Sequence, residues 1–223
     1  MKTIFPFALA GAYFVALIFS LVGCEYFCNY IVLFKMPLTI AATTANTDTL
    51  RLNRDTLWLT TDCSDRLEEE GSHDRYQIPK ISADLRLVDI GHTGSKQVTD
   101  DFDCVSRVGQ ATKVTPIFNG ITYPQSINVE HHYRGSVYNL KIGLVPRKAG
   151  MYKLVSYLRT STLVQLHGDT HCTYDAHVSY LINNGSTDAN HFKFLAQSPD
   201  TLVQKTTASN FTYESGYCFI VGN

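Results

Sequence analysis

The chain has 223 residues, of which 17% are charged and 44% are hydrophobic, and its formal net charge is -1 at pH 7. A net charge this close to zero, with no block of basic residues, argues against a nucleic-acid partner. The 13 tyrosines and 12 phenylalanines, together with abundant threonine and valine, favour strands over helices. At this length, the sequence predicts one large all-β domain behind a leader segment.

The leader has the layout of an export signal. A short positive start precedes an uncharged apolar run from Phe5 to Cys24, which reads FPFALAGAYFVALIFSLVGC. Its last four residues, LVGC, resemble the bacterial lipobox, and this resemblance implies cleavage after Gly23 and a diacylglycerol on the Cys24 thiol. Because two or three acyl chains hold a protein stably on a membrane, the mature chain is expected to be anchored there rather than to span it.

Two other interpretations of the leader stay open. One is an uncleaved transmembrane helix, because about 20 apolar residues suffice to cross a bilayer. The other is a eukaryotic secretory signal cut near Gly23, in which case Asn184 and Asn210, each in an N-x-S/T triplet, would be glycosylation acceptors. The lipoprotein hypothesis places the protein at the outer membrane. It divides the chain into a signal peptide at 1–23, an anchor, tether and first strand at 24–50, and a β-sandwich domain at 51–223.

The cysteines of an exported chain meet an oxidising environment. If Cys24 carries lipid, five thiols remain, which allows two disulfides and one free thiol. No two cysteines form a CxxC pair, which argues against a zinc site built from cysteines. The predicted pairs are Cys63 with Cys104 and Cys172 with Cys218, with Cys28 left free near the tether.

Strands are predicted directly after the leader. Residues 25–35, EYFCNYIVLFK, are interpreted as a first strand that docks on the domain, because tyrosine, isoleucine, valine and phenylalanine suit a pleated surface. A segment lying at the membrane surface is the alternative. Residues 37–53 read as a short strand and a linker. In 55–62, Leu57 and Leu59 fall on the face opposite Trp58, which indicates a strand.

The middle of the chain continues the alternating pattern. Residues 81–87 alternate apolar and polar side chains, and two further strands are predicted at 102–108 and 112–118. Asn119-Gly120 between apolar residues is a strong signal for a tight hairpin turn. Four apolar side chains at even positions then share one face of a strand at 136–145.

The clearest alternation runs from Cys172 to Ile182, where the even positions are apolar or aromatic and most odd positions are polar. One face of this strand is therefore expected in the core and the other in water. No later stretch shows a convincing helical period, and the apolar run 217–221 suits the middle of a sheet. Three closing strands are predicted, at 192–195, 201–204 and 213–221.

Two short stretches resemble known families. DTLWL at 55–59 resembles the opening of many Bacteroidota surface lipoproteins and bacterial immunoglobulin-like domains, with Arg54 where those families usually have glycine. AGMYKL at 149–154 resembles the entry into a late strand of immunoglobulin-like sandwiches, in which a tyrosine hydrogen-bonds back to the preceding corner. The resemblance implies that Tyr152 is this corner residue and that Leu154 replaces the usual cysteine of antibody domains.

Together with the lipobox, these stretches make the chain similar to small Bacteroidota lipoproteins with an immunoglobulin-like domain. The resemblance implies an antiparallel β-sandwich of immunoglobulin-like architecture, which the later alternation extends with additional C-terminal strands. It implies no known catalysis. No GxSxG elbow and no phosphate-binding loop occurs in the sequence, so an enzyme is not favoured, and no cofactor is expected.

The best candidate metal ligands are four side chains near one strand. Imidazole and carboxylate groups suit zinc or copper. Neighbours on one face of a strand lie about 6.8 Å apart, and His171 and Asp175 are four residues apart, so they do not converge without help. A solvated polar face is the alternative interpretation. The candidate set is His167, His171, Asp175 and His177.

Three functions follow from these features. The first hypothesis is a binding module for a glycan, a protein partner or another envelope component, in which exposed Tyr123, Tyr133 and Tyr213 could stack on sugars. The second is a structural or assembly subunit of a surface complex, which would need a pairable strand edge or a large apolar patch. The third is a metal-binding protein or hydrolase that uses the histidines of the candidate set.

Overall fold

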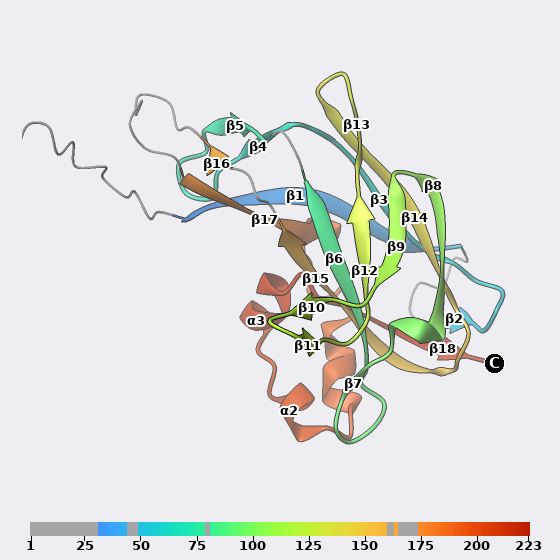
Figure 1. Cartoon of the computed structure of the whole chain (residues 1–223). Helices are drawn as coiled ribbons and strands as arrows, with labels where there is room; N and C mark the ends of the chain where they lie inside the picture. The colour runs from blue at the N-terminus through green and yellow to red at the C-terminus, as the bar shows by residue number, and fades with distance from the viewer. Residues whose placement is uncertain (1–30, 44–48, 79–80, 160–162, 165–173) are drawn as a thin grey trace, which may run out of the picture.

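Two β-sheets packed face to face form the body of the protein (Figure 1). The computed structural model describes residues 31–43, 49–78, 81–159, 163–164 and 174–223. Each sheet has seven strands, and two short hairpins form separate two-stranded sheets. The protein is therefore an all-β sandwich of immunoglobulin-like architecture.

The first sheet, called sheet 1, has the strand order β13-β14-β3-β1-β17-β16, with β8 beside β14. Its β1 pairs in parallel with β17 through residues 31–38 and antiparallel with β3 through residues 39–42. The strands are β1 (Ile31–Ala42), β3 (Leu57–Ser64), β8 (Phe102–Val108), β13 (His132–Arg134), β14 (Val137–Pro146), β16 (Leu163–Val164) and β17 (Tyr174–Ile182).

The second sheet, sheet 2, has the order β2-β18-β15-β6-β12-β9, with β7 beside β6. Its β2 and β18 are parallel, and the other pairs are antiparallel. The strands are β2 (Thr49–Arg51), β6 (Ser82–Asp89), β7 (Lys96–Gln97), β9 (Gln110–Val114), β12 (Ser126–Glu130), β15 (Gly150–Arg159) and β18 (Tyr217–Gly222). The hairpins are β4 (Arg66–Glu68) with β5 (Arg75–Gln77), and β10 (Ile117–Phe118) with β11 (Ile121–Thr122).

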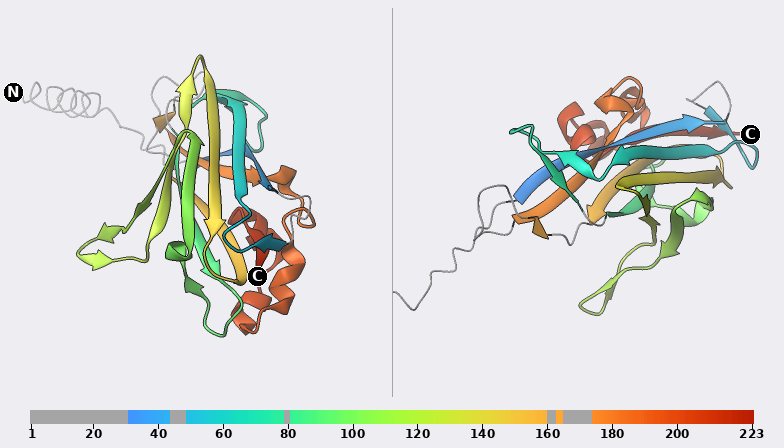
Figure 2. Two further views of the ribbon diagram at one scale, coloured as in Figure 1. Left: turned by 90° about the vertical axis from the view of Figure 1, so that its right-hand side faces the viewer. Right: turned by 90° about the horizontal axis from the view of Figure 1, so that it is seen from above.

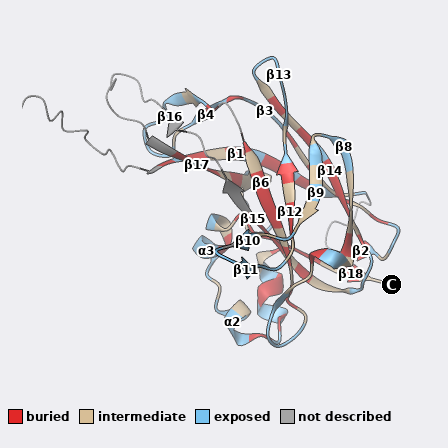
Figure 3. Cartoon of the chain, in the orientation of Figure 1, coloured by how far each residue is buried: buried red, intermediate tan, exposed pale blue. Residues whose placement is uncertain are grey.

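Alternating side chains of the two sheets build the main core. In β3, Leu57 and Leu59 are fully buried, and in β14 the even positions from 138 to 144 are buried, as their period of two predicts (Figure 3). Three aromatic rings lie at the centre of this core. The ring of Phe102 lies 4.9 Å from that of Tyr152 and 5.9 Å from that of Phe219, centroid to centroid.

Tyr152 also joins the core to the corner that precedes β15. Its hydroxyl donates a hydrogen bond to the carbonyl of Lys148, four residues upstream, at 3.0 Å. This is the backward hydrogen bond expected of a tyrosine at such a corner. The hairpin turn at Asn119-Gly120 is also present, because both residues have positive φ, 50° and 75°, and Phe118 pairs with Ile121.

The first strand belongs to the sandwich itself. Phe34, Met36 and Leu38 of β1 are at most 1% exposed, and β1 lies between β3 and β17. The sandwich therefore includes residues 31–42, and β1 runs through Pro37 without ending there. No helix in the described ranges is long and apolar enough to cross a bilayer.

The prediction of strands at 192–195 and 201–204 is wrong. The chain forms three short helical turns there, which we call the helical cap: η3 (Phe192–Gln197), α2 (Thr201–Gln204) and α3 (Ala208–Tyr213). The side chain of Asp200 accepts a hydrogen bond from the amide of Leu202, and that of Thr207 accepts from Asn210, so both α-helices have N-caps. Of the third predicted strand, only β18 is extended.

The cap covers the outer face of sheet 2. Phe194, Leu195 and Phe211 pack on Ile90 and Cys218, which project from the side of the sheet opposite the main core. This small apolar cluster is the reason why the segment folds back as helical turns. Without this cover, the apolar side chains on the outer face of β6 and β18 would lie in water.

The predicted Cys63–Cys104 disulfide is also wrong, because both thiols are free. Cys63 pairs with Tyr138 on one edge of β14, and Cys104 pairs with Leu144 on the other edge. Six residues of extended strand separate these two positions by about 20 Å, far more than a disulfide spans. The thiol of Cys218 is buried beneath the cap, and its predicted partner, Cys172, lies outside the described residues.

Candidate ligand groove

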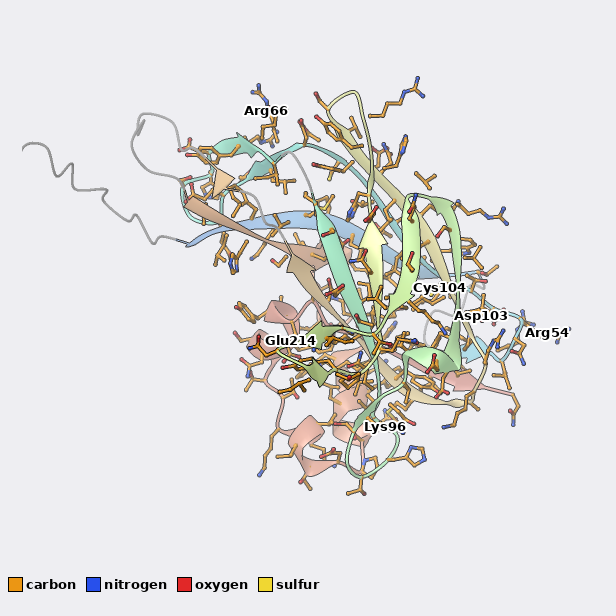
Figure 4. All side chains as sticks on the ribbon, in the orientation of Figure 1. Arg54, Arg66, Lys96, Asp103, Cys104 and Glu214 are labelled. Atoms are coloured by element: carbon orange, nitrogen blue, oxygen red, sulfur yellow. The ribbon has the colours of Figure 1, made fainter. Side chains whose placement is uncertain are left out.

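A groove of about 720 Å³ lies where sheet 1 meets the helical cap. Its floor consists of outward-facing side chains of β1 and β17, and its wall is the exposed side of α3. The volume lies within the range of small-molecule sites. Glu214, labelled in Figure 4, follows α3 and closes the groove together with Ser156 of β15.

The floor is set by the parallel pairing of β1 with β17. In this register Leu33 lies beside His177 and Lys35 lies beside Ser179. All four side chains point away from the core because they occupy odd positions of strands whose even positions are buried. Leu33 is 42% exposed, so the floor offers an apolar surface next to polar groups.

Two residues, Phe211 and Gly216, determine how α3 is placed as the wall. Its Phe211 is fully buried in the cap cluster, which turns Thr212 and Tyr213 toward the groove. Gly216 permits the close return into β18, since a Cβ there would lie 2.5 Å from the ring carbon Cδ2 of Phe211. Tyr213 is left 79% exposed. A large aromatic surface therefore borders the groove with little cover from the protein.

The hydroxyl of Ser156 is the most unusual polar group here. The residue is 5% exposed, and its Oγ has no hydrogen-bond partner among the described residues. Its amide is satisfied, because it donates to the carbonyl of Glu214 at 3.2 Å. A buried hydroxyl without a partner is costly, and it becomes satisfied when a ligand or water binds beside it.

The charges around the groove are balanced in pairs. The ammonium of Lys35 lies 2.5 Å from a carboxylate oxygen of Glu70, and that of Lys153 lies 2.6 Å from Glu214. Lys153 is also 5.7 Å from the ring centroid of Phe211, which fixes it under α3. Each lysine and glutamate that borders the groove thus has an opposite charge at contact distance. An ionic ligand would have to compete with these pairs.

Beyond its pairing with β16, the outer edge of β17 is capped by side chains. Ser215 donates from Oγ to the carbonyl of Tyr180 at 2.8 Å, and Asn190 donates from Nδ2 to the carbonyl of Ile182 at 3.0 Å. Carbonyl groups two residues apart on a strand point the same way, so that of Val178 also points toward this edge. Val178 borders the groove, which adds a main-chain acceptor to the groove's polar groups.

The structure places only part of the predicted metal site. His177 is exposed on β17 and borders the groove. Asp175 belongs to the same strand, but its side chain is not among those described, and His167 and His171 lie outside the described residues, as do Cys24 and Cys28. Within the described chain, no three histidine, cysteine, aspartate or glutamate side chains gather as metal ligands do.

The three tyrosines proposed for sugar stacking have different environments. Tyr213 borders the groove. The hydroxyl of Tyr133 donates to a carboxylate oxygen of Asp65 at 2.8 Å, so its ring is held by the loop beside β4. Tyr123 follows the β10–β11 hairpin. Of the residues that border the groove, His177 and Tyr213 were named from the sequence, but Ser156 and the floor residues Leu33, Lys35 and Ser179 were missed, because no motif marks a groove formed by distant strands.

His131 is a half-buried histidine whose hydrogen bonds give it a structural role. Its Nδ1 donates to the carbonyl of Ile81 at 3.3 Å, and its Nε2 accepts from the hydroxyl of Tyr180 at 2.9 Å. Burial is the main cause that lowers the pKa of His131, to about 4. The imidazole is therefore neutral at physiological pH and links the carbonyl of Ile81 to the hydroxyl of Tyr180 by hydrogen bonds.

Comparisons with known proteins leave the function open. No protein-family model and no curated protein matches the sequence. A solution structure of the CARDB domain of a protein from Pyrococcus furiosus is similar over 64% of this chain and 93% of that chain, with 12% identity and a TM-score of 0.25. The assignment of a β-sandwich rests on the strand order and packing described above.

Proposed function

We propose that this protein is a binding module whose groove takes a small, neutral, hydroxyl-rich ligand, best matched by a short glycan. The observation that carries this proposal is the buried hydroxyl of Ser156, which has no hydrogen-bond partner among the described residues and lies at the edge of a groove whose charges are paired internally. A neutral ligand that donates or accepts hydrogen bonds satisfies this hydroxyl and leaves both ion pairs intact.

The remaining groups of the groove fit the same ligand class. Ser179, Ser209 and Thr212 add hydroxyls, and His177 adds an imidazole. The exposed ring of Tyr213 offers a flat apolar face, and Leu33 continues this surface on the floor. A sugar ring has C–H groups on its faces and hydroxyls around its rim. It therefore meets an aromatic face and several hydrogen-bonding groups at once.

The capped edge of β17 favours a small ligand over a peptide strand. Strand addition needs a row of open main-chain groups. Here the carbonyls of Tyr180 and Ile182 already accept hydrogen bonds from Ser215 and Asn190. Within the described chain, these caps leave a short part of the edge around Val178 for a ligand, so an added strand has too few partners there.

The location belongs to the same proposal. With the lipid on Cys24, the module would be held at the cell envelope, where glycans are abundant, and we place it at the outer membrane. The support is the LVGC tetrad at the end of the apolar leader. Mass analysis of the mature chain tests this part alone: an N-terminal Cys24 with acyl chains supports it, and a chain that starts at Met1 contradicts it.

A glycan array followed by calorimetry tests the ligand. Neutral oligosaccharides are expected to bind, and Tyr213→Ala is expected to weaken the best binder by about tenfold through loss of ring contact. Tyr123→Ala is the matched control, because it removes an exposed tyrosine outside the groove. Equal losses in the two variants, or binding of charged glycans only, would contradict the proposal.

Ser156→Ala separates a ligand-binding hydroxyl from a structural one. Because the hydroxyl has no partner within the described chain, its removal should leave the midpoint of urea unfolding unchanged or raise it slightly. The same variant is expected to lose about tenfold in glycan affinity. A clear loss of stability with unchanged affinity would show that the hydroxyl serves the fold instead.

A further inference from the structure

The β10–β11 hairpin stands away from the sandwich. Both views of Figure 2 show it, in yellow-green, reaching beyond the sheets. Its two strands pair only with each other among the described strands, and the amide of Tyr123 donates to the carbonyl of Pro116 at 2.8 Å to close its base. A two-stranded hairpin alone in water is marginally stable, so a surface that covers it would stabilise it.

The composition of this hairpin is apolar and free of charge. Residues 115–126 read TPIFNGITYPQS and contain no charged side chain. Ile117 is 70% exposed and Ile121 is 60% exposed, and Tyr123 at the base is also exposed. Exposed edges and loops of soluble proteins usually carry charges that prevent association, and here such charges are missing.

The register puts apolar groups on both faces of the hairpin. Ile117 pairs with Thr122 and Phe118 pairs with Ile121, so the two isoleucines project from opposite faces. A flat protein surface covers only one face of such a hairpin. A lipid bilayer surrounds both faces, and the two-residue strands with their turn are about 7–10 Å long, which matches the depth of interfacial insertion.

We propose that the β10–β11 hairpin inserts into the interface of a phospholipid bilayer and sets the orientation of the sandwich on the membrane. Ile117 and Ile121 enter the acyl boundary, and Tyr123 lies at the level of the headgroups, where tyrosine is enriched. This inference does not depend on the glycan ligand. It adds a second contact with the membrane, distant in sequence from the leader.

Tryptophan scanning of the full chain in vesicles tests the insertion. Ile121→Trp and Leu202→Trp place the probe at two highly exposed sites, one in the hairpin and one in α2, and the unmodified chain gives the signal of Trp58 for subtraction. The vesicles contain phosphatidylcholine and phosphatidylglycerol, with or without brominated acyl chains. We expect blue-shifted emission that bromine quenches at position 121, and unquenched, water-like emission at position 202.

Each other outcome overturns the inference. Water-like emission at position 121 in vesicles would show that the hairpin stays in solvent. Quenching at both positions would mean that the domain is embedded without orientation. A blue shift at position 121 that grows with protein concentration in the absence of vesicles would assign the hairpin to contact with a second copy. Near-native circular dichroism of both variants excludes misfolding as a cause.

Discussion

The main core between the sheets and the cluster under the helical cap differ in size and in how their side chains pack. The main core draws buried side chains from strands of both sheets, and longer strands such as β1, β14 and β17 contribute every second residue. The cap cluster has five buried residues and packs on the outer face of a single sheet. The first region therefore folds as one cooperative unit, whereas the second depends on a few contacts. The groove joins a rigid floor to a weakly held wall.

The largest effect should come from the aromatic centre of the main core. Phe219→Ala removes a fully buried ring that contacts both Phe102 and Tyr152. The free energy of unfolding is expected to fall by about 4 kcal/mol, as measured by urea denaturation, because a cavity forms among rigid neighbours. Leu202→Ala, at a 75% exposed position, is the control and should change it by less than about 0.5 kcal/mol.

Acid should weaken the main core through His131. Its folded-state pKa is about 4, below the ordinary value of 6.5, so the unfolded chain binds the proton more readily. The stability contributed by the neutral imidazole is complete above pH 6.5 and is lost as the pH falls from 6.5 to 4. The loss should reach about 3 kcal/mol.

Urea unfolding at several pH values measures this loss. The control is His177→Gln, which removes an exposed histidine and should keep the same pH dependence. A stability that stays flat between pH 6.5 and 4 would mean that His131 is not held neutral by burial.

The cap should respond to substitution locally. Phe211→Ala leaves a cavity at the centre of the cap cluster. The free energy of unfolding is expected to fall by about 2 kcal/mol, less than in Phe219→Ala, because the cap can open while the sheets stay folded. Hydrogen exchange should accelerate in α2 and α3 while amides of β6 and β14 stay protected. The variant should also lose glycan affinity, since α3 forms the wall of the groove. Uniform acceleration across the sheets would mean that cap and core unfold together.

The smallest effect concerns the corner at β15. Tyr152→Phe keeps the ring in the core but removes the hydrogen bond to the carbonyl of Lys148. Thermal unfolding should show a free energy of unfolding that is lower by about 1 kcal/mol, the typical contribution of one hydrogen bond. The cap is not expected to respond, so exchange in α3 should be unchanged. If the free energy of unfolding fell as much as in Phe219→Ala, the hydrogen bond rather than the packing of the ring would be the main stabilising contact of the corner.

The sequence by itself determined which faces of the strands are buried. The alternation in β3, β14 and β17 predicted their core positions, because side chains point to opposite faces at every step along a strand. The Asn119-Gly120 turn and the role of Tyr152 also depend on local geometry. The strand prediction for the cap overlooked two helix signals in the sequence, because Asp200 and Thr207 are typical N-cap residues.

Only the tertiary structure decided which elements meet. Three features depend on residues that are far apart in the chain. They are the parallel pairing of β1 with β17, the separation of Cys63 from Cys104, and the position of Ser156 beside α3. The helical turns of the cap are too short to show a period, and they form because an outer sheet face needs cover. Local patterns specify the direction of a side chain, whereas its neighbours follow from the packing of the whole domain.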